Sequence, residues 1–372
     1  MKKGVALIGF FCILISSIAF ADTIKIGLMG PMTGAWASEG EEMKKVVELF
    51  AADLTRRGGL LGKKIEVISE DDGGDPRTAS LAAHRLVTKG IVAVIGTYGS
   101  SITEATQHIY AEEGLIQIAN GSTAIRLSEK GLRFFFRTCP RDDEQGKVAS
   151  RTIKGLGFKK VAILHDNTTY AKGLAEETKE RLKKDGTAIV FYDALTPGER
   201  DYNAILTKLK TKDPDVVFFT GYYPEAGLLL RQKKEMNWPV PFIGGDATNH
   251  PDLVKIAGRE AAAGFYFLSP PLPQDLPSRE AKQFIATYKK KYGAPPHSIY
   301  PVLAGDAFRV LAHAIGATGS PDSQRVAEYL HKKLKNFPGL TGEISFDEKG
   351  DRVGDVYRVY KVDAHANFIL QN

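Results

Sequence analysis

The chain has 372 residues, of which 43% are hydrophobic and 25% are charged, and its formal net charge is +6. This length is more than one hydrophobic core usually serves and indicates two domains. The basic residues are spread along the sequence without a dense block, so nucleic acid is not an expected partner.

The first 21 residues have the pattern of a cleaved secretory signal. The dipeptide Lys2-Lys3 precedes an apolar run over 5–15, and Ala-Phe-Ala at 19–21 matches a small-x-small cleavage site. The run is short for a membrane-spanning helix, which needs about 20 apolar residues. We therefore expect export to the periplasm and a mature chain that starts at Asp22, soluble and monomeric.

Short apolar strands alternate with amphipathic helices along the first part of the mature chain. From Met43 to Leu54 the apolar positions recur at helical spacing and form one face. We predict strands at 24–29, 65–68, 91–95 and 115–118. Further helices are predicted at 79–87 and 101–113.

The same rhythm restarts after Arg141. Predicted strands cover 161–164, 188–192, 215–219, 241–243 and 264–267, with helices at 175–184, 204–210 and 224–236. The remainder is less regular, with helices at 279–292 and 301–317 and a strand at 356–360. Two such arrays predict an α/β fold of two doubly wound lobes, each a mostly parallel sheet covered by helices.

The sequence offers no sign of catalysis. The common hydrolase, metalloprotease and nucleotide-binding motifs are absent, and the histidines lack metal-ligand spacing. After removal of the signal, Cys139 is the only cysteine, and one thiol forms neither an internal disulfide nor a metal cluster. We therefore predict no catalytic residues, no metal and no cofactor, and we interpret Cys139 as a small buried apolar residue.

Polar residues follow the strand ends, where open α/β sheets bind ligands. Ser100 and Ser101 begin a helix, and Ser101 with Glu104 forms a capping-box pattern. A helix N-terminus suits a carboxylate because its backbone N–H groups are free. The loop 119–123, which contains Gly121, Ser122 and Thr123, offers a similar set of hydroxyl and backbone groups.

The second half supplies complementary groups at Tyr170, Tyr222 and Asp246. An amino acid needs donors for its carboxylate and an anion for its ammonium. The first lobe would supply the donors and Asp246 the anion. A turn-capping role for Asp246 is the alternative that the sequence leaves open.

At these residues the chain resembles the periplasmic leucine/isoleucine/valine-binding proteins, the type I solute-binding proteins of branched-chain amino-acid ABC transporters. The resemblance spans the mature chain. It is carried by Gly30-Pro-Met-Thr-Gly34, Asp71-Asp-Gly-Gly-Asp-Pro76, Gly96 to Ser101, His165-Asp-Asn-Thr-Thr-Tyr170, Gly221-Tyr-Tyr-Pro-Glu225 and Asp347-Glu-Lys-Gly-Asp351.

The resemblance implies roles for these positions. Ser100, Thr123 and Tyr222 would bind the ligand carboxylate. The Gly121 carbonyl, Thr123 and Asp246 would bind its ammonium. The partners would be a free amino acid, most simply leucine, isoleucine or valine, and the permease subunits of an ABC transporter.

The resemblance also implies the side-chain pocket and the domain layout. Tyr98, Tyr170 and Tyr300 would line the pocket. The chain would cross between lobes near 141, 270 and 355. Lobe 1 would then hold 22–141 and 271–354, and lobe 2 would hold 142–270 and 355–372, with the ligand cleft between them and a three-strand hinge.

Two departures from the family concern the anion and a disulfide. Where the family often has glutamate, this chain has Asp246, so the ammonium must lie deeper or a water must bridge. The family's disulfide positions correspond here to Gly74 and Gly99, so that bridge is lost.

A third departure concerns the pocket wall. The family usually covers the ligand side chain with an aromatic residue, and here Glu39 stands in that position, three residues after Trp36. Either Glu39 points inward, which would favour a polar or cationic ligand side chain, or it faces solvent and Trp36 supplies an apolar wall. We expect the second arrangement because it leaves no charge buried without a partner.

Other functions remain open at this point. The same fold could bind a polar or basic amino acid, or a small carboxylate or amide, and could serve a sensor. Asp246 favours a ligand with an ammonium group. An enzyme such as a dehydrogenase is disfavoured because the dinucleotide-binding loop is absent.

Overall fold

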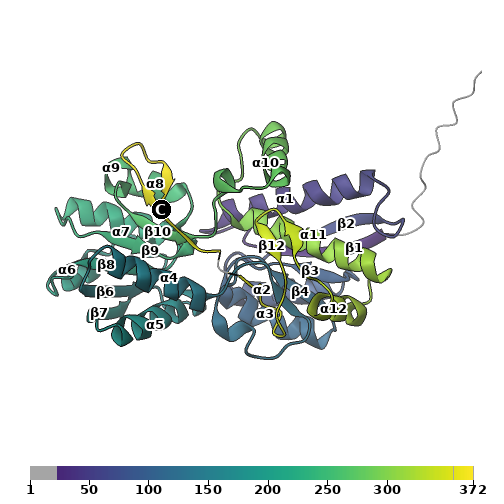
Figure 1. The fold of residues 1–372 in the computed structure, drawn as a ribbon, viewed down its shortest axis with the longest axis horizontal. Coiled ribbons are helices and arrows are strands. Elements are labelled where there is room, and N and C mark those ends of the chain that lie inside the picture. Colours follow the sequence, from purple (N-terminus) through teal and green to yellow (C-terminus); the bar gives the residue numbers. More distant parts are fainter. Residues whose placement is uncertain (1–22, 355, 372) are drawn as a thin grey trace, which may run out of the picture.

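The computed structural model describes residues 23–354 and 356–371, and the predicted signal lies outside them (Figure 1). Two lobes stand side by side, each built around its own sheet. This is the predicted α/β architecture of two doubly wound lobes.

The first sheet consists of five parallel strands in the order β2-β1-β3-β4-β5. Residues of the interior strand β1 point into different cores: Ile26 and Leu28 pack on one face of the sheet and Met29 on the other. Both faces are therefore buried, as in other parallel sheets. The strands are β1 Thr23–Gly30, β2 Lys64–Asp71, β3 Ala93–Ile95, β4 Ile116–Ala119 and β5 Phe135–Arg137.

The helices of this lobe come from both ends of the described chain. Helix α11 packs along α1, and Phe284 of α10 stacks on Phe50 of α1. A two-stranded hairpin, β11 with β12, lies beside α11. The bounds are α1 Ala37–Arg56, α2 Pro76–Val87, α3 Ser100–Glu112, α10 Arg279–Tyr292, α11 Tyr300–Thr318, α12 Ser323–Lys332, β11 Phe337–Gly339 and β12 Gly342–Ile344.

The second sheet has the order β14-β13-β10-β9-β8-β6-β7, with β13 and β14 as an antiparallel edge on an otherwise parallel sheet. Its strands are β6 Lys160–His165, β7 Ala188–Ala194, β8 Val216–Thr220, β9 Phe242–Gly244, β10 Tyr266–Ser269, β13 Arg358–Val362 and β14 Phe368–Leu370. Its helices are α4 Asp142–Gly155, α5 Thr169–Lys184, α6 Asn203–Lys210, α7 Tyr223–Glu235, α8 Asp252–Ala257 and α9 Arg259–Ala262.

The chain passes between the two sheets three times: after β5, after β10 and before β13 (Figure 1). The segments that join the lobes therefore come from well-separated parts of the sequence. The domain boundaries that we placed at 141, 270 and 354 stay a prediction.

Several elements escaped prediction for physical reasons. Helix α4 is mostly polar, yet Asp142, Gln145 and Ser150 are buried in it, so its buried face does not show as an apolar stripe. Strand β5 has only three residues. Helix α12 has a short apolar face of Val326, Ala327 and Leu330 that covers α11.

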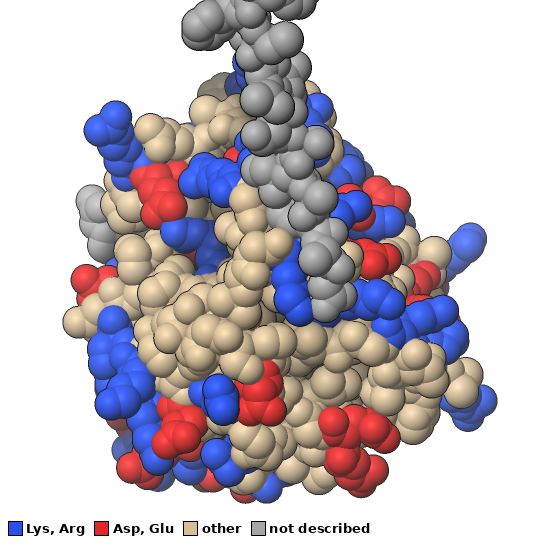
Figure 2. All heavy atoms as spheres, turned by 90° about the vertical axis from the view of Figure 1, so that its right-hand side faces the viewer, with Lys and Arg blue, Asp and Glu red and all other residues tan. Residues whose placement is uncertain are grey.

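The surface carries both signs of charge. Over the face drawn in Figure 2, lysine and arginine are interspersed with aspartate and glutamate. Among the residues that the structure describes, no helix is long and apolar enough to cross a bilayer.

Candidate functional site

Loops that follow strands of both sheets meet between the lobes. Trp36, after β1, packs on Tyr222, after β8, with ring centroids 4.0 Å apart. The Tyr223 hydroxyl donates to the Ala35 carbonyl at 2.9 Å. These contacts place the carboxyl ends of parallel strands from the two lobes against each other, where α/β proteins bind ligands.

The predicted aromatic residues form one cluster across this junction. Tyr98 lies 5.6 Å from Trp36, 5.7 Å from Tyr222 and 4.9 Å from Tyr300, measured between ring centroids. Tyr170 adds a further contact with Tyr222 at 5.6 Å. Offset and edge-on pairs at these distances are favourable, so the rings form a defined wall.

Two glycines make room for Trp36 in this wall. A Cβ atom added at Gly74 would lie 2.9 Å from the indole, and one added at Gly99 would lie 3.2 Å from it. These are the positions where the family resemblance implies a disulfide. The indole occupies the space beside both positions, so larger side chains at either one would collide with it.

Asp246 is the acidic centre of the junction. It opens the short turn η2 (Asp246–Thr248), is 1% exposed, and accepts a hydrogen bond on Oδ2 from Tyr357 at 3.0 Å. Its Oδ1 is buried and has no hydrogen-bond partner among the described residues. The side chain caps no helix or turn, so the capping alternative is wrong.

The environment of Asp246 favours an incoming cation. Burial raises the pKa of the carboxyl, and the surrounding polar side chains lower it in part, in the order Tyr170, Gln145, Tyr357 and Tyr300. A buried carboxylate with a bare oxygen is costly unless a charged partner is supplied.

Sequence reasoning missed three residues of this centre. Asp142 is fully buried, and burial together with the charge of Asp246 raises its pKa well above the ordinary value. Gln145 accepts from the Asp246 backbone N–H at 2.8 Å and donates weakly to Asp142 at 3.3 Å. Tyr357 donates to Asp246 from 111 residues away in the sequence. The only local sequence signal for any of these three residues was the acidic first turn of helix α4, which begins at Asp142.

In the loop after β4, Gly121 and Thr123 lie where a ligand could reach them, as predicted, but Ser122 does not. The Thr123 hydroxyl is buried without a partner among the described residues, and Ser100 Oγ accepts from the Ala124 N–H at 3.2 Å. A Cβ atom at Gly121 would lie 2.7 Å from the Tyr98 carbonyl, so only glycine fits there. Ser122 instead points into the lobe, where it pairs with Thr103 Oγ1 at 2.7 Å, and its hydroxyl is not free for a ligand.

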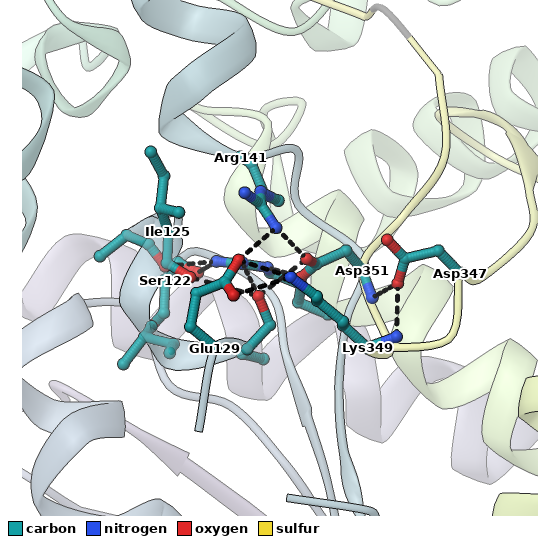
Figure 3. A network of polar contacts seen from close by, with 12 residues as sticks. Ser122, Ile125, Glu129, Arg141, Asp347, Lys349 and Asp351 are labelled. Carbon is teal, nitrogen blue, oxygen red and sulfur yellow. Dashed lines mark hydrogen bonds and ion pairs between the residues drawn. The ribbon is translucent and has the colours of Figure 1, made fainter. Parts of the chain in front are cut away.

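The buried ion pair of Arg137 with Asp351 supports this loop, and Figure 3 shows Ser122, Arg141 and Asp351 in the same network of polar contacts. Arg137 donates to the carbonyls of Ser122 at 3.0 Å and Ala124 at 2.8 Å, and its Nε donates to Asp351 at 2.5 Å. Asp351 also accepts from Arg141 at 2.7 Å. The motif 347–351, which carried part of the family resemblance, thus supports the Gly121–Thr123 loop.

The capping-box prediction at α3 is wrong. Gly99 is the N-cap and no side chain caps the helix. Ser101 Oγ instead accepts from the Thr169 N–H of the second lobe at 3.0 Å, and Glu104 bonds Arg126 and the Thr169 hydroxyl. The residues that suggested a cap bridge the lobes, because their side chains find partners that the sequence does not reveal.

The expectation that Glu39 faces solvent is also wrong. Glu39 is 1% exposed, its Oε2 accepts from the Ser298 hydroxyl at 2.7 Å, and its Oε1 is buried without a partner among the described residues. Helix α1 begins at Ala37 and turns this face inward, so Glu39 and Trp36 both lie at the junction. One oxygen of this carboxyl therefore lacks a hydrogen bond within the described residues.

Neither a thiol nor a metal cluster marks the site. Cys139 is buried, and burial raises the pKa of its thiol to about 12, which leaves it neutral. Within residues 23–354 and 356–371, no group of histidine, cysteine and acidic side chains could hold a metal ion.

The comparisons with known proteins agree with this geometry. Residues 23–367 match the family described as periplasmic binding protein, so the chain belongs to that family of two-lobed binding proteins. More narrowly, it belongs with the Leu/Ile/Val-binding proteins. Leu/Ile/Val-binding protein homolog 1 of Brucella abortus (strain 2308) is 36% identical over 99% of this chain and 98% of its own length.

Two further relatives carry ligand information in their names. The leucine-, isoleucine-, valine-, threonine- and alanine-binding protein of Pseudomonas aeruginosa is 33% identical over 97% of each chain. The branched-chain amino acid transporter substrate-binding protein LivJ of Streptococcus pneumoniae was solved with isoleucine. It has a TM-score of 0.86 at 32% identity and covers 94% of this chain and 99% of its own.

Proposed function

We propose that this protein captures a free L-α-amino acid between its lobes, outside the cytoplasm, and delivers it to the permease of an ABC transporter. The observation that carries the proposal is the buried carboxyl of Asp246, whose Oδ1 has no partner among the described residues. An α-ammonium group would supply the missing charge. The unpartnered Thr123 hydroxyl and the N-terminus of α3 would receive the carboxylate.

The relatives support transport rather than catalysis, because their names describe binding of amino acids and association with transporters. They also support leucine, isoleucine or valine as the ligand. The assignment of these aliphatic ligands assumed that Trp36 forms an apolar pocket wall and that Glu39 faces solvent. Because Glu39 is buried, we restrict this proposal to an α-amino acid and consider its side chain separately.

Thermal melts with each of the common L-amino acids test the proposal. A ligand that binds only the folded protein stabilises it by about 2.7 kcal/mol at a concentration of 100 Kd. We expect at least one amino acid to raise Tm, and the matching 2-oxo acid, which lacks the ammonium, to have no effect. The proposal fails if no amino acid raises Tm, or if the 2-oxo acid does so equally.

A further inference from the structure

Glu39 lies at the boundary between the two lobes. Its chain neighbour Ser38 donates to Asp252 of the second lobe at 3.1 Å, and the charge of Glu39 contributes to the raised pKa values of Tyr98 in the first lobe and Tyr223 in the second. The charge of Asp246 also contributes to the raised pKa of Tyr98. The charges of both carboxyls therefore act on the Tyr98 hydroxyl, whose ring packs against Trp36 and Tyr300.

The surroundings of Glu39 satisfy only half of its carboxyl. Ser298 bonds Oε2, and Oε1 is buried and bare. Burial is the main reason that the pKa of Glu39 is raised to about 8, and the neighbouring negative charges of Glu42 and Asp252 raise it further. The Tyr98 hydroxyl is likewise buried without a partner among the described residues.

Such a pair of unmet polar atoms is expensive in a protein interior. A buried polar atom without a hydrogen bond usually costs about 1–3 kcal/mol. An aliphatic ligand side chain beside it would leave that cost in place. A side chain that ends in a hydroxyl, an amide or an ammonium would remove it, because a hydroxyl or amide both donates to and accepts from a neutral carboxyl, and an ammonium ionises it.

We infer that Glu39 selects the ligand, and that the amino acid bound between the lobes has a side chain ending in a hydrogen-bond donor: a hydroxyl, an amide or an ammonium. The ligand α-ammonium binds at Asp246 and its side chain extends past Tyr98 to Glu39. This inference rests on the proposed function, and it names the ligand class for the same site.

Calorimetry with pairs of ligands of nearly equal shape tests the inference. The pairs are threonine against valine, asparagine against leucine, glutamine against methionine, and lysine against norleucine. We expect the polar member of at least one pair to bind about tenfold or more tightly, because a site built to hydrogen-bond a ligand rejects the analogue that lacks the group.

The variants assign that preference to Glu39. In Glu39→Leu we expect the ratio within the winning pair to fall to about one or to invert. Glu42→Gln is the matched control: Glu42 lies one turn further along α1, is 6% exposed, and bonds His297 rather than carrying a bare oxygen. It should keep the wild-type ratio, and unliganded melts of each variant verify folding.

Glu39→Gln separates the donor types. If a hydroxyl or amide is the partner, the glutamine carbonyl still accepts, and most of the affinity remains. If an ammonium is the partner, the affinity falls at least about tenfold. Wild-type binding of lysine would then release a proton at pH 7, because a cation ionises a carboxyl whose pKa is about 8.

The outcomes distinguish this inference from the proposed function. If the apolar member of every pair binds more tightly, or if Glu39→Leu leaves the ratio unchanged, Glu39 does not select the ligand, although the protein still binds amino acids. If no amino acid of any pair binds, the proposed function itself is wrong.

Discussion

At the residue scale, one carboxyl receives the ligand ammonium in the proposed site. Asp246 is fully buried, one of its oxygens is held by Tyr357, and the other is bare. The family often has glutamate here, and the shorter side chain raised the question of a water bridge. Tyr357 and Gln145 fix the position of this shorter side chain, because the first donates to the carboxyl and the second accepts from the backbone N–H of Asp246.

We predict that Asp246→Ala nearly abolishes amino-acid binding while the fold survives. Removal of one partner of a buried charge pair typically costs about 2–5 kcal/mol, which corresponds to roughly 30- to several-thousand-fold in Kd. Calorimetry measures the effect. Asp306→Asn is the control, because Asp306 is equally buried but bonds the backbone of Leu340 and Thr341. A change of less than about threefold for Asp246→Ala would exclude it as the ammonium partner.

At the scale of elements, the ligand loop after β4 depends on a distant segment. Arg137 of β5 holds the carbonyls of Ser122 and Ala124, and Asp351, from the segment before β13, holds Arg137. Gly350 allows this approach, because a Cβ atom there would lie 2.1 Å from the Phe135 carbonyl. The third passage between the lobes is thus joined to the ligand loop by buried polar contacts.

We predict that Asp351→Asn both destabilises the protein and weakens ligand binding. Loss of one member of a buried pair commonly costs about 3–5 kcal/mol in folding, and the loop 121–124 loses its support. Urea unfolding gives the first quantity and calorimetry the second. Glu129→Gln serves as the control, because Glu129 is an exposed partner of Arg141 and Lys349 and its loss should change little. Equal behaviour of the two variants would show that Asp351 has no positioning role.

At the scale of the whole molecule, the proposed site consists of groups from both lobes. Trp36 packs on Tyr222, Thr169 donates to Ser101, and Tyr223 donates to Ala35. No lobe holds both the acidic centre at Asp246 and the Gly121–Thr123 loop. A ligand that binds both would hold the lobes against each other as they lie here, and closure about the three connecting segments on binding is the expected motion.

We predict that ligand binding reduces the radius of gyration. Small-angle scattering on the mature protein, with and without a saturating amino acid, measures the change. The Asp246→Ala variant at the same ligand concentration should stay at the unliganded value. An unchanged radius in the wild type at proven saturation would contradict a clamp mechanism.

Much of the architecture could be predicted from local patterns. The apolar run of β1 reflects a strand buried on both faces, and the helical spacing from Met43 to Leu54 reflects a helix buried on one face. Both patterns involve residues close together in the sequence, so they can be recognised without the fold. The predicted order of strands and helices placed Tyr98, Gly121, Tyr222 and Asp246 after strand ends. It did so because parallel strands present their carboxyl ends at one edge of a sheet.

The sequence by itself therefore determined the α/β class, the two arrays and most of the candidate loops. Only the tertiary structure decided which side chains enter the junction. Glu39 is buried, Ser122 turns away, and Asp142 and Tyr357 join Asp246. The reason is physical: the burial and partners of a polar side chain depend on packing between separate segments, 19 residues apart for Ser122 and Thr103, 111 for Tyr357 and Asp246 and 259 for Glu39 and Ser298, which no local pattern records.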